Sequence, residues 1–552
     1  MRRGAALLCL LLASVHLVYL PHAEFLLDDW GVLARYEKAG QEGPAAQAQV
    51  AVDLLRNRFH GQFRFQWISF QLGYLLYLLF GWAPAPIFAA SVLVHAACAL
   101  ALARAVRKLG IGEAPALLSG TLFVLLPTTH GPLLWSHNCG FFLWSTLWFL
   151  LYLGSLAASL REGRLDGRAA LRQAALLLAA LFSGDPVFVL LLAAAPAVGL
   201  YLRSKLAWRA TLLAWGTVAA AAAFYALVIN QTPLLRAGVG LRYDFDWENL
   251  RGNLLFILAT YRRLSGLGRE AFFELRLTPA AAAAGLAALG VALAACRRPE
   301  AAGRRREVGR PMGVPWRPMS LAAALWTAAY GPIWFIRGHE YRYDYVPSPY
   351  LALGLSLAVL ALPAGRLLGP ALAAWMAVAT VANIQQGWIP QSRNLRAVGA
   401  ALRGLGSLEP GDLIIVSGTR LWIGAAPHFA FLAGWASSAF AQRATGVPGL
   451  EAAREIASEA GRLRIYHRNY MRDLNPGETS RTRVLVAGRG DRIRERRLLA
   501  QQVAPGAFRV YPLKGYSGPP PSTETYTREQ LGLMRGTIYF APQAEDHRAL
   551  DW

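Results

Sequence analysis

The chain has 552 residues, of which 55% are hydrophobic and 16% are charged, with a mean hydropathy of +0.32. Since a soluble domain carries about a quarter charged residues, this composition excludes an ordinary soluble protein and indicates a helical membrane protein. The net charge of +23 does not indicate a nucleic-acid partner, because arginines cluster in short loops between apolar segments, as the positive-inside rule requires. All four cysteines lie in apolar segments, so neither a disulfide framework nor a metal-binding cysteine pair is expected.

Apolar segments recur through the first part of the chain, and each is near the roughly 20 residues that span hydrocarbon as a helix. Eleven qualify as spans: 4–20, 86–106, 115–130, 138–159, 169–183, 186–202, 208–229, 279–296, 319–336, 347–364 and 370–387. The first follows two arginines and shows no small-residue cleavage site before Pro21. We therefore expect an uncleaved helix with its N-terminus inside rather than a signal peptide.

The segment 66–82 is apolar but short, and the charges of the loops decide its place. If it spans, the basic loops 104–108, 161–172, 203–209 and 297–310 all lie outside. If it is an interfacial or re-entrant helix, all four lie inside, in agreement with the positive-inside rule. The sequence therefore predicts about 11 transmembrane helices plus an interfacial helix, with the polar clusters gathered on the outer face.

The composition changes after Gln386, where long apolar segments stop. Three short runs are expected to be strands: 411–418, 483–488 and 508–511. The segment 451–463 is expected to be helical. We predict an all-α polytopic membrane domain over 1–389 and an extracytoplasmic α/β domain over 390–552.

Two adjacent carboxylates, Asp28 and Asp29, follow the first span and precede Trp30. Attack on the anomeric carbon of a sugar needs a base to accept the proton of the acceptor hydroxyl. Partial desolvation at an interface raises the pKa of a carboxylate, which makes it a better base. A solvated interfacial loop, with Trp30 in the aromatic belt, explains the same residues. Spacing alone leaves both interpretations open.

Arg58 and Arg64 lie in the same outer segment. The planar guanidinium suits a phosphate or diphosphate leaving group, and snorkelling to lipid headgroups is the alternative. Asp185 stands at a tight turn, where it either caps the helix that begins at Pro186 or contributes to a site. His137 lies in an outer turn, and the chain has no HExxH spacing that would predict zinc.

The densest polar cluster at the end of a span is the segment 339–348. It places Glu340, Arg342, Asp344 and Tyr345 in one short loop. Ionisable residues at a membrane boundary are functional candidates by default. This segment is therefore predicted to contribute to a site.

The order of these clusters resembles the C-type membrane glycosyltransferase superfamily, and within it protein O-mannosyltransferases and bacterial enzymes that use lipid-linked sugars. The resemblance covers about the first 390 residues and rests on four places: Asp28-Asp29-Trp30; Phe63-Arg64-Phe65 with 79–81 and 94–96; 122–135 with 182–185; and 340–348. This chain departs from the family pattern at Gly184, which replaces a lysine, and at Asp185, which replaces a glutamate. Its C-terminal region is not a tetratricopeptide array.

The resemblance implies a glycosyltransferase of the inner (plasma) membrane. It implies inverting transfer of a sugar from a polyprenyl-phosphate donor, held in the lipid bilayer, to an extracytoplasmic protein, lipid or glycan. In that interpretation Asp28 or Asp29 is the base. Arg58, Arg64 and Arg342 bind the donor phosphate, and the supporting residues are Asp185, His137, Glu340 and Tyr345. No cofactor is predicted, and the sequence leaves open whether a divalent metal assists.

Two other functions stay open at this level. A transporter or flippase would place ionisable residues near mid-depth in the bilayer and show inverted repeats. A non-catalytic envelope assembly protein would act through its outer domain.

Overall fold

The computed structural model covers the whole chain. It describes residues 13–26, 29–55, 66–134, 140–184, 187–224, 227, 246–265, 277–296, 315–331, 333–334, 341–405, 408–417 and 434–459, and beyond them the strands given below. These residues divide into two compact units. Unit 1 comprises Met1–Ala23, Ala39–Trp388 and Gly424–Pro427, and unit 2 comprises Glu24–Lys38, Ile389–Ile423 and His428–Trp552.

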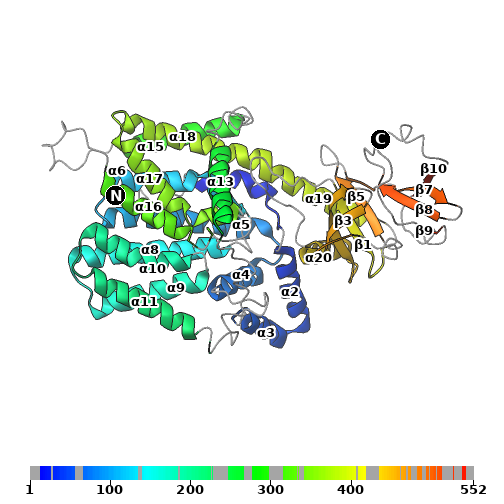
Figure 1. The fold of residues 1–552 in the computed structure, drawn as a ribbon, viewed down its shortest axis with the longest axis horizontal. Helices are drawn as coiled ribbons and strands as arrows, with labels where there is room; N and C mark the ends of the chain where they lie inside the picture. Colours follow the sequence, from blue (N-terminus) through cyan, green and yellow to red (C-terminus); the bar gives the residue numbers. More distant parts are fainter. Residues whose placement is uncertain are drawn as a thin grey trace. The chain divides into compact units, whose positions relative to one another are not determined.

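Unit 1 is built of helices (Figure 1). In chain order they are η1 (Ser14–His22), α3 (Pro44–Leu55), α4 (Trp67–Phe80), α5 (Pro84–Lys108), α6 (Glu113–Leu125), η2 (Pro127–Thr129), α7 (His130–Leu134), α8 (Gly140–Glu162), α9 (Gly167–Ser183), α10 (Phe188–Leu202), α11 (Ala207–Phe224), α13 (Trp247–Leu264), α15 (Pro279–Cys296), α16 (Trp316–Ala329), η6 (Tyr341–Tyr345), α17 (Ser348–Ala361), α18 (Gly365–Asn383) and the π-helical turn η7 (Ile384–Trp388). Helix α5 packs against α6 and α8, α8 against α9, α17 against α6, and α15 against α18. The buried core therefore lies between helices, as expected for elements that are apolar over most of their surface.

Local sequence signals explain where the long helix α5 begins and ends. Pro84 occupies its first turn, where a missing N–H leaves no hydrogen bond unmade. Arg107 and Lys108 lie in its last turn, where positive charge interacts favourably with the helix dipole. Gly110 then adopts φ of +78°, a left-handed conformation that glycine reaches without strain.

Three helical stretches of the described residues are long and apolar enough to cross a membrane: Pro84–Lys108, Gly140–Glu162 and Gly365–Gly404. The pair Glu113–Leu125 and Pro127–Leu134, bent by 56°, adds a fourth if it is one broken span. Each predicted apolar segment overlaps a helix, although most of these helices are shorter than a full crossing. The structure is thus compatible with the helical membrane protein that the composition predicts.

Unit 2 combines helices with two β-sheets (Figure 1). Its helices are most of α2 (Asp29–Glu42), α19 (Ile389–Gly404) and α20 (Gly434–Thr445). The first sheet has the order β4-β3-β2-β1-β5-β6, from β1 (Leu413–Ser417), β2 (Glu451–Glu459), β3 (Arg462–His467), β4 (Tyr470–Asp473), β5 (Thr482–Ala487) and β6 (Ile493–Glu495). The second has the order β10-β7-β8-β9, from β7 (Leu498–Ala504), β8 (Ala507–Pro512), β9 (Tyr526–Thr527) and β10 (Ile538–Ala541). The three runs expected to be strands fall on β1, β5 and β8.

The expectation of a helix over 451–463 is wrong. This segment forms β2 and the start of β3, with Leu413 opposite Glu451 in a parallel pair and Glu455 opposite Ile465 in an antiparallel pair. Its alanines, arginines and glutamates favour a helix locally, but hydrogen bonding to a strand on each side outweighs that preference of a few tenths of a kcal/mol per residue. Helices α2, α3 and α13 lie in segments predicted only as outer loops.

Candidate functional site

The structure describes only part of the predicted site. The side chains of Asp29 and Tyr345 are described, and the backbone of Arg342 is described as part of η6. The other predicted site residues lie outside the described residues: Asp28, Arg58, Arg64, His137, Asp185 and Glu340. The convergence of these carboxylates and arginines therefore stays a prediction.

Asp29 closes the turn that leads into α2. The Leu26 N–H donates to Asp29 Oδ2 at 3.2 Å, and the Asp29 N–H donates to the Leu26 carbonyl at 3.0 Å. The side-chain bond is the half of a capping box in which a carboxylate three residues on accepts a backbone N–H that would otherwise lack a partner, while the return bond is made by the backbone. Asp29 is only 1% exposed, and Trp30 Nε1–H donates to the Phe25 carbonyl at 2.9 Å beside it. The carboxylate is thus a buried anchor of the turn rather than a solvated loop residue.

Replacing Asp29 with alanine is expected to lower the free energy of unfolding by about 1–2 kcal/mol, because the Leu26 N–H loses its acceptor. Asp29→Asn keeps an oxygen in the same position and should lose well under half as much. Thermal unfolding of both variants in detergent measures the difference. Equal losses for alanine and asparagine would contradict the capping role.

A second cluster lies in unit 1, around η6 and the start of α17. Asp344 is fully buried, and the Tyr330 hydroxyl donates to its Oδ1 at 2.6 Å. Tyr330 is in turn 3.0 Å from the Tyr261 hydroxyl. A short hydroxyl–carboxylate bond of this kind is charge-assisted, and it offsets part of the several kcal/mol that desolvating a carboxylate costs. The pairing ties η6 to α16 and α13.

The Ser348 hydroxyl adds a second tie. It donates to the Asp344 carbonyl at 2.6 Å and lies 2.9 Å from the Thr128 hydroxyl of η2. Asp344 is therefore held through its carboxylate by Tyr330 and through its carbonyl by Ser348, which in turn contacts η2. This is the segment that carries Arg342.

Tyr345, at the end of η6, contacts a buried histidine. Its hydroxyl lies 2.8 Å from His95 Nδ1, and His95 Nε2 lies 3.3 Å from the Val124 carbonyl. A carbonyl only accepts, so His95 carries its proton on Nε2, and Nδ1 accepts from the Tyr345 hydroxyl. Burial raises the pKa of the Tyr345 hydroxyl well above its usual range, which keeps it a donor. The two side chains thus form a neutral chain that ends on a backbone carbonyl.

The end of α6 explains why that carbonyl is available. The helix ends at Leu125, and the carbonyls of a last helical turn have no donor within the helix, so they need other partners. Val124 receives His16 Nε2 at 2.9 Å as well as His95. Leu125 receives the Thr380 hydroxyl at 2.7 Å. A break in one helix therefore recruits polar side chains from η1, α5 and α18.

Three buried histidines meet at this break. The His16 ring lies 5.4 Å from the His95 ring and 5.5 Å from the His130 ring, both edge to face. Among the described residues no group of three histidine, cysteine or acidic side chains has a geometry that could hold a metal ion. The Nε2 atoms of His16 and His95 both point at the Val124 carbonyl instead. His16 and His95 therefore serve as hydrogen-bond donors to the end of α6.

Tyr345→Phe is expected to lower the free energy of unfolding by about 1–2 kcal/mol, since His95 Nδ1 is left buried without its donor. Tyr350→Phe is the matched control. It is equally buried, and its hydroxyl has no hydrogen-bond partner among the described residues, so its removal should be neutral. Thermal unfolding of the two variants in detergent measures the difference in stability. Equal stability of both variants would contradict a stabilising contact between Tyr345 and His95.

Sequence reasoning singled out Tyr345 but missed most of its surroundings. His95 lies inside a predicted span, and its two contacts show a packed, hydrogen-bonded histidine. Tyr261, Tyr330 and His16 carry no local signal, because what marks them is proximity to Asp344 or Val124. Pro127, inside the predicted span 115–130, is a local signal that could have pointed to this end of α6, since the end of a helix leaves carbonyls to be satisfied.

Comparison of the chain with protein-family models, with curated proteins and with solved structures finds no match.

Proposed function

We propose that the chain is a membrane glycosyltransferase that moves a sugar from a polyprenyl-phosphate donor to an acceptor outside the cytoplasm. In this proposal eleven helices cross the plasma membrane, helix α4 lies at the interface, and residues 390–552 form an extracytoplasmic α/β domain. In the proposal, the ordered acidic and arginine clusters that resemble those of the C-type glycosyltransferases gather on the outer face. That one-sided arrangement suits a donor whose isoprenoid tail stays in the bilayer.

The observation that carries the proposal is the anchoring of η6. Hydrogen bonds between Asp344 and Tyr330 and between Tyr345 and His95 fix this segment to its neighbours. Arg342 lies in the same turn. A cation on a segment that hydrogen bonds already fix needs to move little when negative charge develops on a leaving group. Such preorganisation is the main requirement of electrostatic catalysis. We assign Arg342, with Arg58 and Arg64, to the donor phosphate.

The proposed reaction is a single displacement. Asp28 accepts the proton of the acceptor hydroxyl while the oxygen of that hydroxyl bonds to the anomeric carbon. The bond from that carbon to the phosphate oxygen breaks, and the electron pair stays on the polyprenyl phosphate. The configuration at the carbon inverts. Asp29 is left to hold the turn in place, and Asp185, His137 and Glu340 support the substrates.

The test uses the full chain in proteoliposomes with a panel of short-chain polyprenyl-phosphate sugars, each labelled in the sugar. The acceptor is a membrane and periplasmic extract from a strain that lacks the protein. Label should move to the extract only when the protein and a matching donor are both present. Label that crosses the bilayer with no acceptor added would instead identify a transporter or flippase. If neither transfer nor flux occurs, and the C-terminal region alone restores a deletion strain, an assembly role replaces the proposal.

A further inference from the structure

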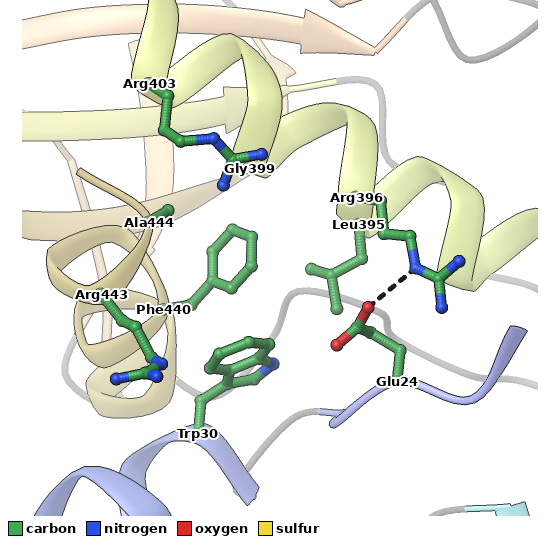
Figure 2. A pocket seen from close by; sticks show the side chains of 9 residues that line it. All are labelled: Glu24, Trp30, Leu395, Arg396, Gly399, Arg403, Phe440, Arg443 and Ala444. Atoms are coloured by element: carbon green, nitrogen blue, oxygen red, sulfur yellow. Dashed lines mark hydrogen bonds and ion pairs between the residues drawn. The ribbon is translucent and has the colours of Figure 1, made fainter. Parts of the chain in front are cut away.

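A pocket of about 550 Å³ lies within unit 2, and three arginines line it. Arg396 and Arg403 come from α19 and Arg443 from α20, while Trp30 of α2 and Phe440 of α20 form an aromatic wall. Figure 2 shows the two rings side by side, with guanidinium groups around them. The volume falls in the range of about 300–1,000 Å³ typical of small-molecule sites.

Helical spacing brings these side chains together. Residues 396 and 403 are seven apart, so they lie on one face of α19, and Phe440 and Arg443 are three apart on one face of α20. Gly399 stands between the two arginines of α19. A Cβ at that position would lie 3.3 Å from Phe440 Cζ and 3.8 Å from Arg403 Nη1. The absent side chain therefore leaves the space that the pocket occupies.

The arginines are only partly neutralised. Arg396 Nε pairs with Glu24 Oε2 at 3.0 Å, and Arg443 Nη1 pairs with Glu37 Oε1 at 2.7 Å. Arg403 makes no ion pair with any residue that the structure describes. Among the described residues the three arginines are matched by two carboxylates, Glu24 and Glu37, so a net charge of +1 remains beside the pocket.

The wall of the pocket offers a surface for an uncharged group. The Trp30 and Phe440 rings pack edge to face with centroids 4.8 Å apart, and Phe440 is only 5% exposed. Such a rigid pair accepts a ring or an acyl chain with little loss of side-chain freedom. Arginine forks match phosphate oxygens two at a time.

We infer that this pocket binds a phosphate-bearing ligand, with its anionic group on Arg396, Arg403 and Arg443 and its apolar part against Trp30 and Phe440. A phosphate monoester supplies an anionic partner for Arg403 and further oxygens for the other two guanidinium groups. A soluble phosphate ester and a lipid phosphate headgroup share this chemistry. The inference does not depend on the proposed transfer reaction, because every residue it uses lies outside the predicted catalytic set.

The test is calorimetry of the purified full chain in detergent. It measures the binding of two soluble probes, phenyl phosphate and inorganic pyrophosphate. Nanodiscs with phosphatidic acid, compared with nanodiscs of phosphatidylcholine alone, supply the lipid headgroup. At least one phosphate-bearing probe should bind with a dissociation constant below about 1 mM, and more weakly at high salt because exposed charges are screened. Binding only in the nanodisc comparison identifies the lipid source, and binding of phenyl phosphate identifies the soluble one.

Arg403→Gln should weaken that binding by about tenfold, the effect of losing one charge-assisted contact. Arg393→Gln is the matched control, because it removes the same charge from an exposed position of α19 that does not line the pocket. Gly399→Ala should weaken phenyl phosphate more than pyrophosphate, since the added methyl narrows the space beside Phe440. Equal losses for Arg403→Gln and Arg393→Gln, or no binding of any probe, would overturn the inference.

Discussion

Asp344→Ala is expected to lower the free energy of unfolding by about 2–4 kcal/mol, the largest loss of stability that we predict. The substitution leaves the buried Tyr330 hydroxyl without its acceptor at 2.6 Å, which costs about 1–3 kcal/mol, and opens a cavity besides. Asp344→Asn keeps an acceptor oxygen and relieves the burial of a charge, so its effect should stay within about 1 kcal/mol of wild type. Thermal unfolding in detergent compares the two.

Tyr330→Phe tests the same bond from its other end. It should destabilise the chain by about 1–3 kcal/mol, because the Asp344 carboxylate loses a donor. Tyr152→Phe is the matched control, since that buried hydroxyl has no hydrogen-bond partner among the described residues. A double-mutant cycle of Tyr330→Phe with Asp344→Asn should show coupling of about 1 kcal/mol. Strictly additive effects would mean that the contact contributes nothing to stability.

Asp28→Asn is expected to slow sugar transfer by about 10²–10⁴-fold, the usual contribution of a general base. Since asparagine has the shape of aspartate and lacks only its basicity, the fall should appear in kcat while the KM for the polyprenyl-phosphate donor changes little. Asp29→Asn keeps the acceptor that holds the Leu26 N–H, so its activity should stay within a few-fold of wild type. Initial rates with labelled donor in proteoliposomes measure both variants.

The comparison separates two assignments. If Asp29→Asn is inactive and Asp28→Asn is not, the base is Asp29, and its buried position serves catalysis as well as the turn. Two fully active variants would remove both aspartates from the chemistry. Arg342→Gln extends the test, because loss of a phosphate contact should raise the KM for the donor or slow departure of the phosphate, with no change in acceptor dependence.

Much of the helical architecture was predictable from the sequence, and particular misses show why the rest was not. The apolar segments 86–106 and 138–159 became α5 and α8, because a run of that length can satisfy its backbone only as a helix in hydrocarbon. Helix α13 was missed because it mixes apolar residues with arginines and asparagine. The segment 451–463 became strands because its partners, β1 and β3, lie elsewhere in the chain.

The candidate site was less predictable still. The pattern around 339–348 singled out Tyr345 and Asp344 as polar residues at a helix end, and both prove to be buried. Their partners Tyr330 and His95 are 14 and 250 residues away along the chain. Side chains at such separations meet only through the packing of α16 and α5, so no local pattern marks them.

The sequence by itself predicted the membrane class and the positions of the long apolar helices, because both follow from hydropathy. Only the tertiary structure decided which groups satisfy the carbonyls of Val124 and Leu125 at the end of α6, which hydroxyl holds Asp344, and that arginines of α19 and α20 share a pocket with Trp30. These contacts join segments far apart in the chain. Their energies arise from burial and hydrogen bonding that exist only once the helices have packed.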